Sequence, residues 1–234
     1  MTDRFTRWTL RAGALFVIAL AAWSRATLRA AVFIDGETYP LDTDCHYHLR
    51  RALRTLEHFP HVPVRDPWIN WPDGATPTWG PGFDQLLALP AWLAGAAGDI
   101  ARASRIIAWV PFVLGLLVVV ATMYLARALD PDEGDRDATA LAAGAFAATL
   151  PISALTSTAG RIDHHVFEAL TTALVALWLA RPPALRAPWR FEAAGALAVL
   201  FTVHTFTGTL LQWGLAAAAL AARSLFDEAP PRSP

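Results

Sequence analysis

The sequence contains no lysine, one cysteine and little charge of either sign. All 19 basic residues are arginines, which we attribute to genome composition, and the formal net charge is −1. A chain without a basic field is a poor nucleic-acid binder, so we exclude nucleic acid as a partner. The single Cys45 has no partner for an internal disulfide and is interpreted as a small packing residue. With 17% charged and 55% hydrophobic residues, the chain is too apolar for an ordinary soluble domain.

Long apolar runs take the place of the missing charge. A helix that crosses a bilayer needs about 20 largely apolar residues. Six runs approach this length: Trp8–Thr27, Ser104–Leu129, Ala138–Thr158, Val166–Ala180, Phe191–Thr205 and Thr209–Ala222. The sequence therefore predicts an all-α polytopic membrane protein with about six transmembrane helices, a membrane domain over residues 1–226 and a disordered tail over residues 227–234.

The arginines predict the orientation of these helices. They gather in four segments, at the N-terminus, around residues 127–136, around residues 181–190 and near the C-terminus. Because arginine-rich loops stay in the cytoplasm, both ends are predicted inside, with a long outer loop over residues 34–103. An apolar stretch at residues 83–98 is predicted to be an interfacial or re-entrant helix. The prolines and tryptophans of this loop indicate a membrane-surface anchor or, alternatively, a groove for an isoprenoid or a sugar.

Two clusters of acids and histidines lie where predicted helices leave the outer face. One runs from Asp42 to Arg51 and the other from Gly160 to Glu168. On a helix, residues two apart point about 200° from each other, so Asp163 and His165 can converge on an ion only in a turn or extended segment. With Asp44 from the first cluster they would form a split site for Mn²⁺ or Mg²⁺, with Zn²⁺ as an alternative because of the imidazole. The alternative is that both clusters are hydrated connections.

Other polar residues of the two clusters have supporting roles in this prediction. Asp42, His164 and Glu168 are expected to contact the ligands rather than the ion, and the same applies to His46 and His48. Arg50 and Arg51 suit the phosphate oxygens of a substrate, although arginines at this depth also meet lipid headgroups.

In order and spacing, these motifs resemble the N-terminal part of the oligosaccharyltransferase catalytic subunit, including its bacterial and archaeal single-subunit relatives. The resemblance runs from about Arg7 to Ala222. It is carried by Asp44-Cys45-His46-Tyr47-His48-Leu49-Arg50, by the stretch from Asp66 to Gly74 followed by the stretch from Trp79 to Asp84, and by Gly160-Arg161-Ile162-Asp163-His164-His165. A weaker match is His204-Thr205-Phe206-Thr207-Gly208.

The resemblance implies a GT-C-type glycosyltransferase fold and activity. Asp44, Asp163 and His165 would hold the divalent ion beside a polyprenyl-(pyro)phosphate-linked sugar donor, with Asp44 and Asp163 as the catalytic residues. The glycan would pass to an asparagine of an acceptor protein or peptide on the periplasmic face of a bacterial inner membrane. Because the family's further helices, catalytic outer-loop acid and Trp-Trp-Asp domain are not in this sequence, we expect a fragment or one half of an enzyme completed by a separate C-terminal half. The alternatives are a decayed paralogue and an enzyme with another acceptor, such as a lipid or a glycan.

Two other functions fit the same residues. The first is a noncatalytic membrane module that binds a polyprenyl lipid or scaffolds a partner. The second is a metal or proton transporter. We rank it last because transport needs ionisable groups along helices at mid-membrane depth, and only His204 comes close to that.

Overall fold

The computed structural model describes residues 2–180, with side chains from residue 8 onward, and the positions 193, 195, 197, 200, 214, 217, 218 and 221. The predicted helices Phe191–Thr205 and Thr209–Ala222 and the predicted tail 227–234 lie outside the continuously described residues.

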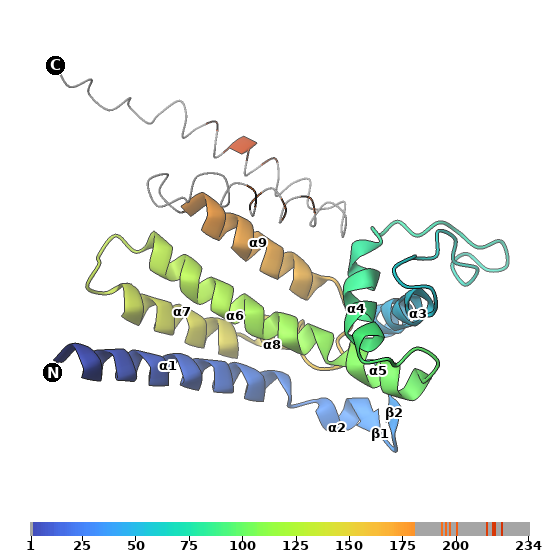
Figure 1. Cartoon of the computed structure of the whole chain (residues 1–234), viewed down its shortest axis with the longest axis horizontal. Helices are drawn as coiled ribbons and strands as arrows, with labels where there is room; N and C mark the ends of the chain where they lie inside the picture. Colours follow the sequence, from blue (N-terminus) through green and yellow to red (C-terminus); the bar gives the residue numbers. More distant parts are fainter. Residues whose placement is uncertain are drawn as a thin grey trace.

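Four long helices lie side by side and form a bundle (Figure 1). They are α1 (Thr2–Arg25), α6 (Val110–Leu129), α7 (Arg136–Thr149) and α9 (His165–Ala180). The apolar α6 lies in the middle, where it contacts α1, α7 and α9. The bundle confirms the mainly helical fold that was predicted.

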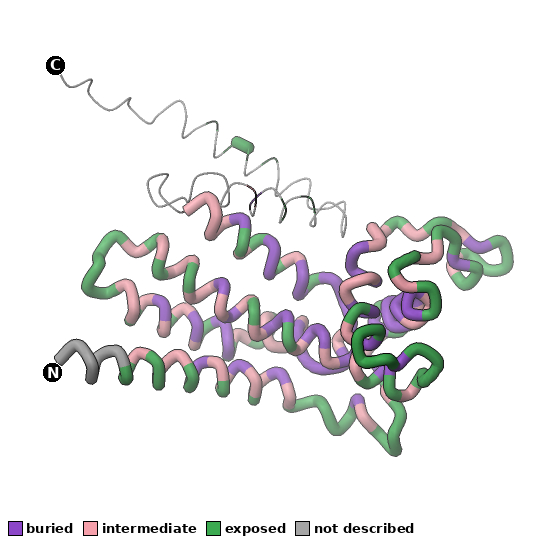
Figure 2. Tube along the Cα trace, in the orientation of Figure 1, coloured by how far each residue is buried: buried purple, intermediate pink, exposed green. Residues whose placement is uncertain are grey.

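A smaller unit, which we call the cap, covers one end of the bundle (Figure 1). It consists of α3 (Thr43–Glu57), α4 (Gly82–Leu93), α5 (Ile100–Ala108) and the irregular loop 58–81 between α3 and α4. A short helix α2 (Arg29–Val32) and a hairpin of β1 (Phe33–Ile34) and β2 (Glu37–Thr38) connect α1 to the cap. Buried residues concentrate where the cap meets the bundle (Figure 2), and Phe83, Ile107 and Ile162 are among them.

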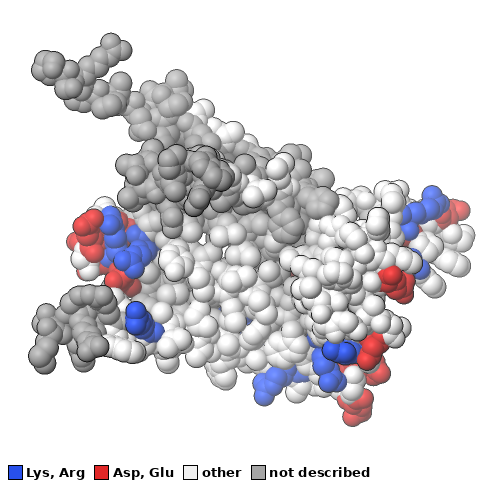
Figure 3. Space-filling view, viewed as in Figure 1, with Lys and Arg blue, Asp and Glu red and all other residues white. Residues whose placement is uncertain are grey.

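Two stretches of the described residues are long and apolar enough to cross a membrane, Trp8–Val32 and Ile100–Leu129, whereas His165–Ala180 is apolar but shorter. Charged side chains gather at the α6–α7 turn and over the cap, and the flank of the bundle between them is almost uncharged (Figure 3). This distribution suits a bilayer, but the predicted number of six spans remains a prediction.

The structure gives three of the predicted elements different bounds. The predicted span Ser104–Leu129 falls on the end of α5 and on α6, with Trp109 between them. The predicted span Ala138–Thr158 breaks into α7 and α8 (Pro151–Leu155), because Leu150 takes an extended ψ of 119° ahead of Pro151. The predicted helix at 83–98 is the shorter α4, which is followed by Gly95 at a φ of +62°. The helix α4 packs against α3 and α5 within the cap.

Arg25, at the end of α1, is fully buried and joins three parts of the chain. Its guanidinium donates to the carbonyl oxygens of Ala147 and Ala148, at 3.3 and 3.2 Å, and to Ser157 Oγ at 2.8 Å. These carbonyls belong to the last turn of α7, where a cation compensates the negative end of the helix dipole. Gly115 gives the space, because a Cβ there would lie 2.6 Å from Arg25 Nε.

The same end of α1 fixes the loop that precedes α9. The carbonyl of Arg25 accepts hydrogen bonds from Thr158 Oγ1 and from the Ala159 amide. Gly160 has a φ of +83°, and a Cβ on it would lie 2.5 Å from a methyl of Val32. The loop that leads to Asp163 is therefore held from its first residues.

Candidate metal-binding site

The second polar cluster forms a turn at the entrance of α9. Asp163 is 4% exposed and lies just before the helix, and its Oδ1 accepts from the His164 amide at 2.7 Å. His165 is the first residue of α9, and its Nε2 lies 3.8 Å from Asp163 Oδ2. The turn thus brings Asp163 and His165 together. The sequence analysis required a turn or an extended segment here if the two residues are to share an ion.

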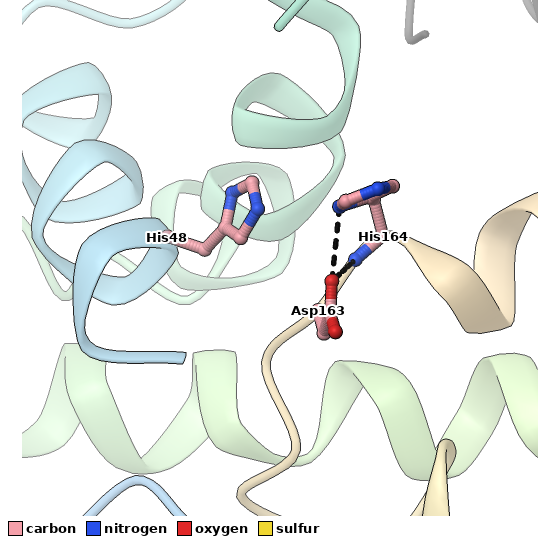
Figure 4. Close-up of side chains that lie close together, drawn as sticks. All are labelled: His48, Asp163 and His164. Atoms are coloured by element: carbon pink, nitrogen blue, oxygen red, sulfur yellow. Dashed lines mark hydrogen bonds and ion pairs between the residues drawn. The ribbon is translucent and has the colours of Figure 1, made fainter. Parts of the chain in front are cut away.

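The first polar cluster meets this turn through His48 on α3. Figure 4 shows His48 pointing toward His164 and Asp163 from across the junction between cap and bundle. Ligand atoms of these three residues lie within 4.8 Å of one another. His48 Nδ1 is buried and has no hydrogen-bond partner among the described residues. A buried ring nitrogen without a hydrogen-bond partner calls for an explanation, and coordination of a metal ion would provide one.

A second group of potential ligands lies beside the first and shares His164. Ligand atoms of His164, His165 and Glu168 also lie within 4.8 Å of one another. Glu168 Oε2 is 2.9 Å from His165 Nδ1, while its Oε1 is buried without a hydrogen-bond partner in the described part of the chain. Together the two groups offer carboxylates and imidazoles, a donor set that fits Mn²⁺ or Zn²⁺ and is less typical of Mg²⁺.

Asp42 and Asp44 begin α3 and have different surroundings. Asp42 is the N-cap, because its Oδ1 accepts from the Cys45 amide at 2.9 Å, and its Oδ2 lies 2.6 Å from Arg161. Asp42 therefore ties the start of α3 to the Asp163 loop. Asp44 is exposed and belongs to neither group of potential ligands. It lies four residues before His48, so both occupy the same face of α3.

The two arginines at the end of this cluster are paired with carboxylates, and the sequence analysis did not predict these pairs. Arg50 lies 2.6 Å from Asp66, and the buried Arg51 lies 2.7 Å from Asp84. Asp84 also lies 3.7 Å from His48 Nδ1. A lone acid within the apolar stretch 83–98 was the signal for Asp84, because such a carboxylate needs a partner.

The surroundings of the site shift the pKa values of Asp163, Cys45 and His165. Burial raises the pKa of Asp163, but the hydrogen bond with His164 and the nearby imidazoles outweigh it and lower the pKa to about 2. Burial, with a contribution from Asp42, raises the pKa of Cys45 to about 12, which agrees with a packing role. The hydrogen bond with Glu168 raises the pKa of His165.

We predict that metal-free His165 titrates above about pH 6.5, the ordinary value for histidine. The pair with Glu168 adds stability below that pH, and the contribution is lost as the pH rises through the raised pKa. Ring-proton NMR of the chain in EDTA measures the midpoint. Glu168→Gln should lower it, while Glu57→Gln, at an exposed acid near the end of α3, should leave it unchanged. A midpoint at or below 6.5 in the unmodified chain would contradict the prediction.

The sequence of this chain matches a known protein family over most of its length. A family model described as the N-terminal part of oligosaccharyl transferase STT3 matches residues 13–223. The glycotransferase AglB of Haloferax volcanii is 30% identical over 117 residues, which cover 48% of this chain and 11% of that relative. Dolichyl-phosphooligosaccharide-protein glycotransferase 2 of Archaeoglobus fulgidus is 28% identical over 152 residues, covering 64% of this chain and 24% of the relative.

Solved structures show the same fold. The Archaeoglobus fulgidus oligosaccharyltransferase AglB with an inhibitory peptide and a dolichol-phosphate aligns at a TM-score of 0.68 and 18% identity, covering 86% of this chain and 24% of that one. A complex of an Archaeoglobus fulgidus oligosaccharyltransferase with Zn and sulfate aligns at 0.62 and 21% identity, covering 81% of this chain and 24% of that one. The chain thus spans about a quarter or less of the length of these relatives.

Proposed function

Because the chain belongs to the N-terminal family of the oligosaccharyl transferase STT3, we propose that it takes part in glycan transfer at a membrane. The donor is a glycan linked to a polyprenyl (pyro)phosphate, and the acceptor is an asparagine of a protein or peptide. The archaeal relatives carry names of this activity, and solved neighbours contain a dolichol-phosphate or an acceptor peptide with an Asn-Val-Thr sequon.

One observation carries the proposal for this chain. Two polar clusters more than a hundred residues apart meet in space, with His48 from α3 beside Asp163 and His164 from the turn before α9. We propose that Asp44, Asp163 and His165 hold the divalent ion, and that His48, His164 and Glu168 surround them. Mn²⁺ is the ion we propose, with Mg²⁺ and Zn²⁺ as alternatives, and Zn is present in one solved neighbour.

The residues of this chain prepare the site in three ways. Asp163, with a pKa of about 2, is a carboxylate at any physiological pH. Glu168 accepts at one ring nitrogen of His165 and so leaves the other nitrogen, 3.8 Å from Asp163, to the ion. The Asp42–Arg161 pair holds the two clusters at a fixed separation. When bound, a divalent ion supplies a Lewis acid that neutralises charge on the leaving phosphate.

The remaining groups define where donor and acceptor approach. Asp44 is exposed one helical turn from His48, and we propose that it contacts the acceptor amide. Arg50, whose side chain is 36% exposed, is the arginine that we propose for the donor phosphate. We place the site on the outer face of the plasma membrane, and a separate C-terminal half remains part of the proposal.

A peptide glycosylation assay tests the function. The chain in detergent is incubated with Mn²⁺, a fluorescent peptide containing Asn-Val-Thr and lipid-linked oligosaccharide from membranes of the source organism. The assay is run alone and with the C-terminal part of the Archaeoglobus fulgidus enzyme, because the chain spans about a quarter of that relative. We expect a glycosylated peptide that disappears with EDTA. No product in either arm would favour the noncatalytic lipid-binding module.

A further inference from the structure

A cavity lies in the cap beside the metal-binding site. Its volume is about 240 Å³, and Arg51, Val62, Thr76, Pro77 and Trp79 are among its lining residues. Trp79 also contacts His164, with 4.8 Å between the ring centroids. The cavity is therefore separated from the potential metal ligands by one indole ring.

Arg51, which lines the cavity, carries a hydrogen-bond donor that meets no partner among the described residues. Its side chain is 3% exposed, and its Nε and Nη2 bind Asp84 at 2.8 and 2.7 Å. The guanidinium carbon lies 5.7 Å from the centre of the Tyr47 ring. The remaining nitrogen, Nη1, is buried and has no hydrogen-bond partner among residues 8–180. Leaving a buried donor unpaired is costly, so a ligand oxygen at this point would be stabilised.

Most residues that line the cavity are apolar, and three of them are prolines. Pro63, Pro77 and Pro81 line it, and each ring fixes its own backbone φ. Trp79 adds an aromatic surface, which packs well against aliphatic C–H groups. A volume of about 240 Å³ is below the roughly 300–1,000 Å³ of sites for drug-sized ligands. The cavity therefore suits a single small ring.

From these features we propose that the cavity binds one neutral pyranose ring of the glycan donor, stacked on Trp79 with a hydroxyl accepting from Arg51 Nη1. The identification of the ring as part of the donor rests on the proposed function. Because Arg51 is neutralised by Asp84, the cavity offers a hydrogen bond without net positive charge, which favours a hydroxyl over a phosphate. An isoprenoid chain would leave the buried donor unpaired.

Saturation-transfer NMR on the chain in a sugar-free zwitterionic detergent tests the proposal. The probes are methyl glucoside, methyl mannoside, methyl galactoside and N-acetylglucosamine, with sorbitol as a polyol that has no ring. EDTA is present, so that the sugar is measured without the ion. We expect transfer to the ring C–H protons of at least one pyranoside and none to sorbitol.

Four variants locate the binding. Val62→Trp fills the cavity and Trp79→Ala removes its aromatic wall, and both should abolish the transfer. Arg51→Lys keeps a cation for Asp84 but removes Nη1, and should weaken binding about tenfold. Trp68→Ala is the matched control, because Trp68 is 58% exposed, stacks on Trp71 and does not line the cavity.

The outcomes separate this proposal from the proposed function. Three results would overturn the sugar site. They are no saturation transfer to any pyranoside, equal saturation transfer to sorbitol, and undiminished saturation transfer to the pyranoside in Val62→Trp. Mn²⁺ binding is measured on the same samples without EDTA. If the sugar binds as expected but Mn²⁺ does not, the proposed metal site is wrong and the sugar site stands. If Mn²⁺ binds but no sugar does, the sugar site is wrong and the metal site stands.

Discussion

Replacing Asp163 with asparagine is expected to lower the affinity for Mn²⁺ by at least about 100-fold. Changes to groups that only orient a ligand already cost about 10–100-fold in affinity, and Asp163 is a buried carboxylate that lies beside both His164 and His165. Asparagine keeps the size of the side chain and an oxygen for the His164 amide, so the turn should persist. Titration calorimetry of the chain in detergent measures the affinity.

Three further variants make this test selective. His165→Gln and Asp44→Asn should each weaken Mn²⁺ binding if the ion is held by the three predicted residues. Asp99→Asn is the matched control, because Asp99 is an exposed N-cap of α5, and asparagine retains that cap. Unchanged affinity in Asp163→Asn would refute the site. Loss in Asp163→Asn with no effect of Asp44→Asn would move the third ligand to His48.

Replacing Arg25 with methionine is expected to destabilise the protein by at least about 3 kcal/mol. Methionine fills similar space but removes the guanidinium donors of the Ala147 carbonyl, Ser153 Oγ and Ser157 Oγ. Each buried polar group without a partner costs about 1–3 kcal/mol. For a chain of this size such a loss lowers the unfolding midpoint by roughly 6–12 °C, which thermal unfolding in detergent would measure.

The controls for Arg25 come from the same segment. Arg29→Met changes an exposed arginine whose guanidinium donates to the carbonyl of Ala26, and should leave the midpoint nearly unchanged. Arg25→Lys retains the charge at the end of α7 and should lose less stability than Arg25→Met. Equal midpoints for Arg25→Met and Arg29→Met would show that the buried guanidinium contributes little. Reduced Mn²⁺ affinity in Arg25→Lys would indicate that it also positions the Asp163 loop.

Periodicity and charge were enough to predict the bundle but not its breaks. The apolar runs that became α1, α6 and α9 were visible because each needs only local pattern. The division of Ala138–Thr158 depends partly on Pro151, which is visible in the sequence. It also depends on the hydrogen bonds from Arg25 to the carbonyls at the end of α7, which the sequence does not reveal. A donor that comes from more than 120 residues away leaves no local pattern.

The candidate site was predicted only in part, because some of its contacts also join distant segments of the chain. The sequence placed Asp163 and His165 in one turn and required an extended segment, and the structure has that turn. It predicted Asp44 as the partner of Asp163, whereas the structure groups His48, on the same face of α3, with Asp163 and His164. The pairs Arg50–Asp66 and Arg51–Asp84 were equally hidden, since they join α3 to distant parts of the outer loop.

The sequence by itself therefore determined the membrane-like composition, the main helices, the family resemblance and the two polar clusters. These properties depend on residue type and short spacing, which are written directly in the chain. Only the tertiary structure decided how cap and bundle meet, which imidazoles face Asp163, and that a cavity lies behind Trp79, lined by an arginine with one nitrogen unpaired among the described residues. Those properties depend on the packing of α3 against the loop before α9, a contact between segments that no local pattern specifies.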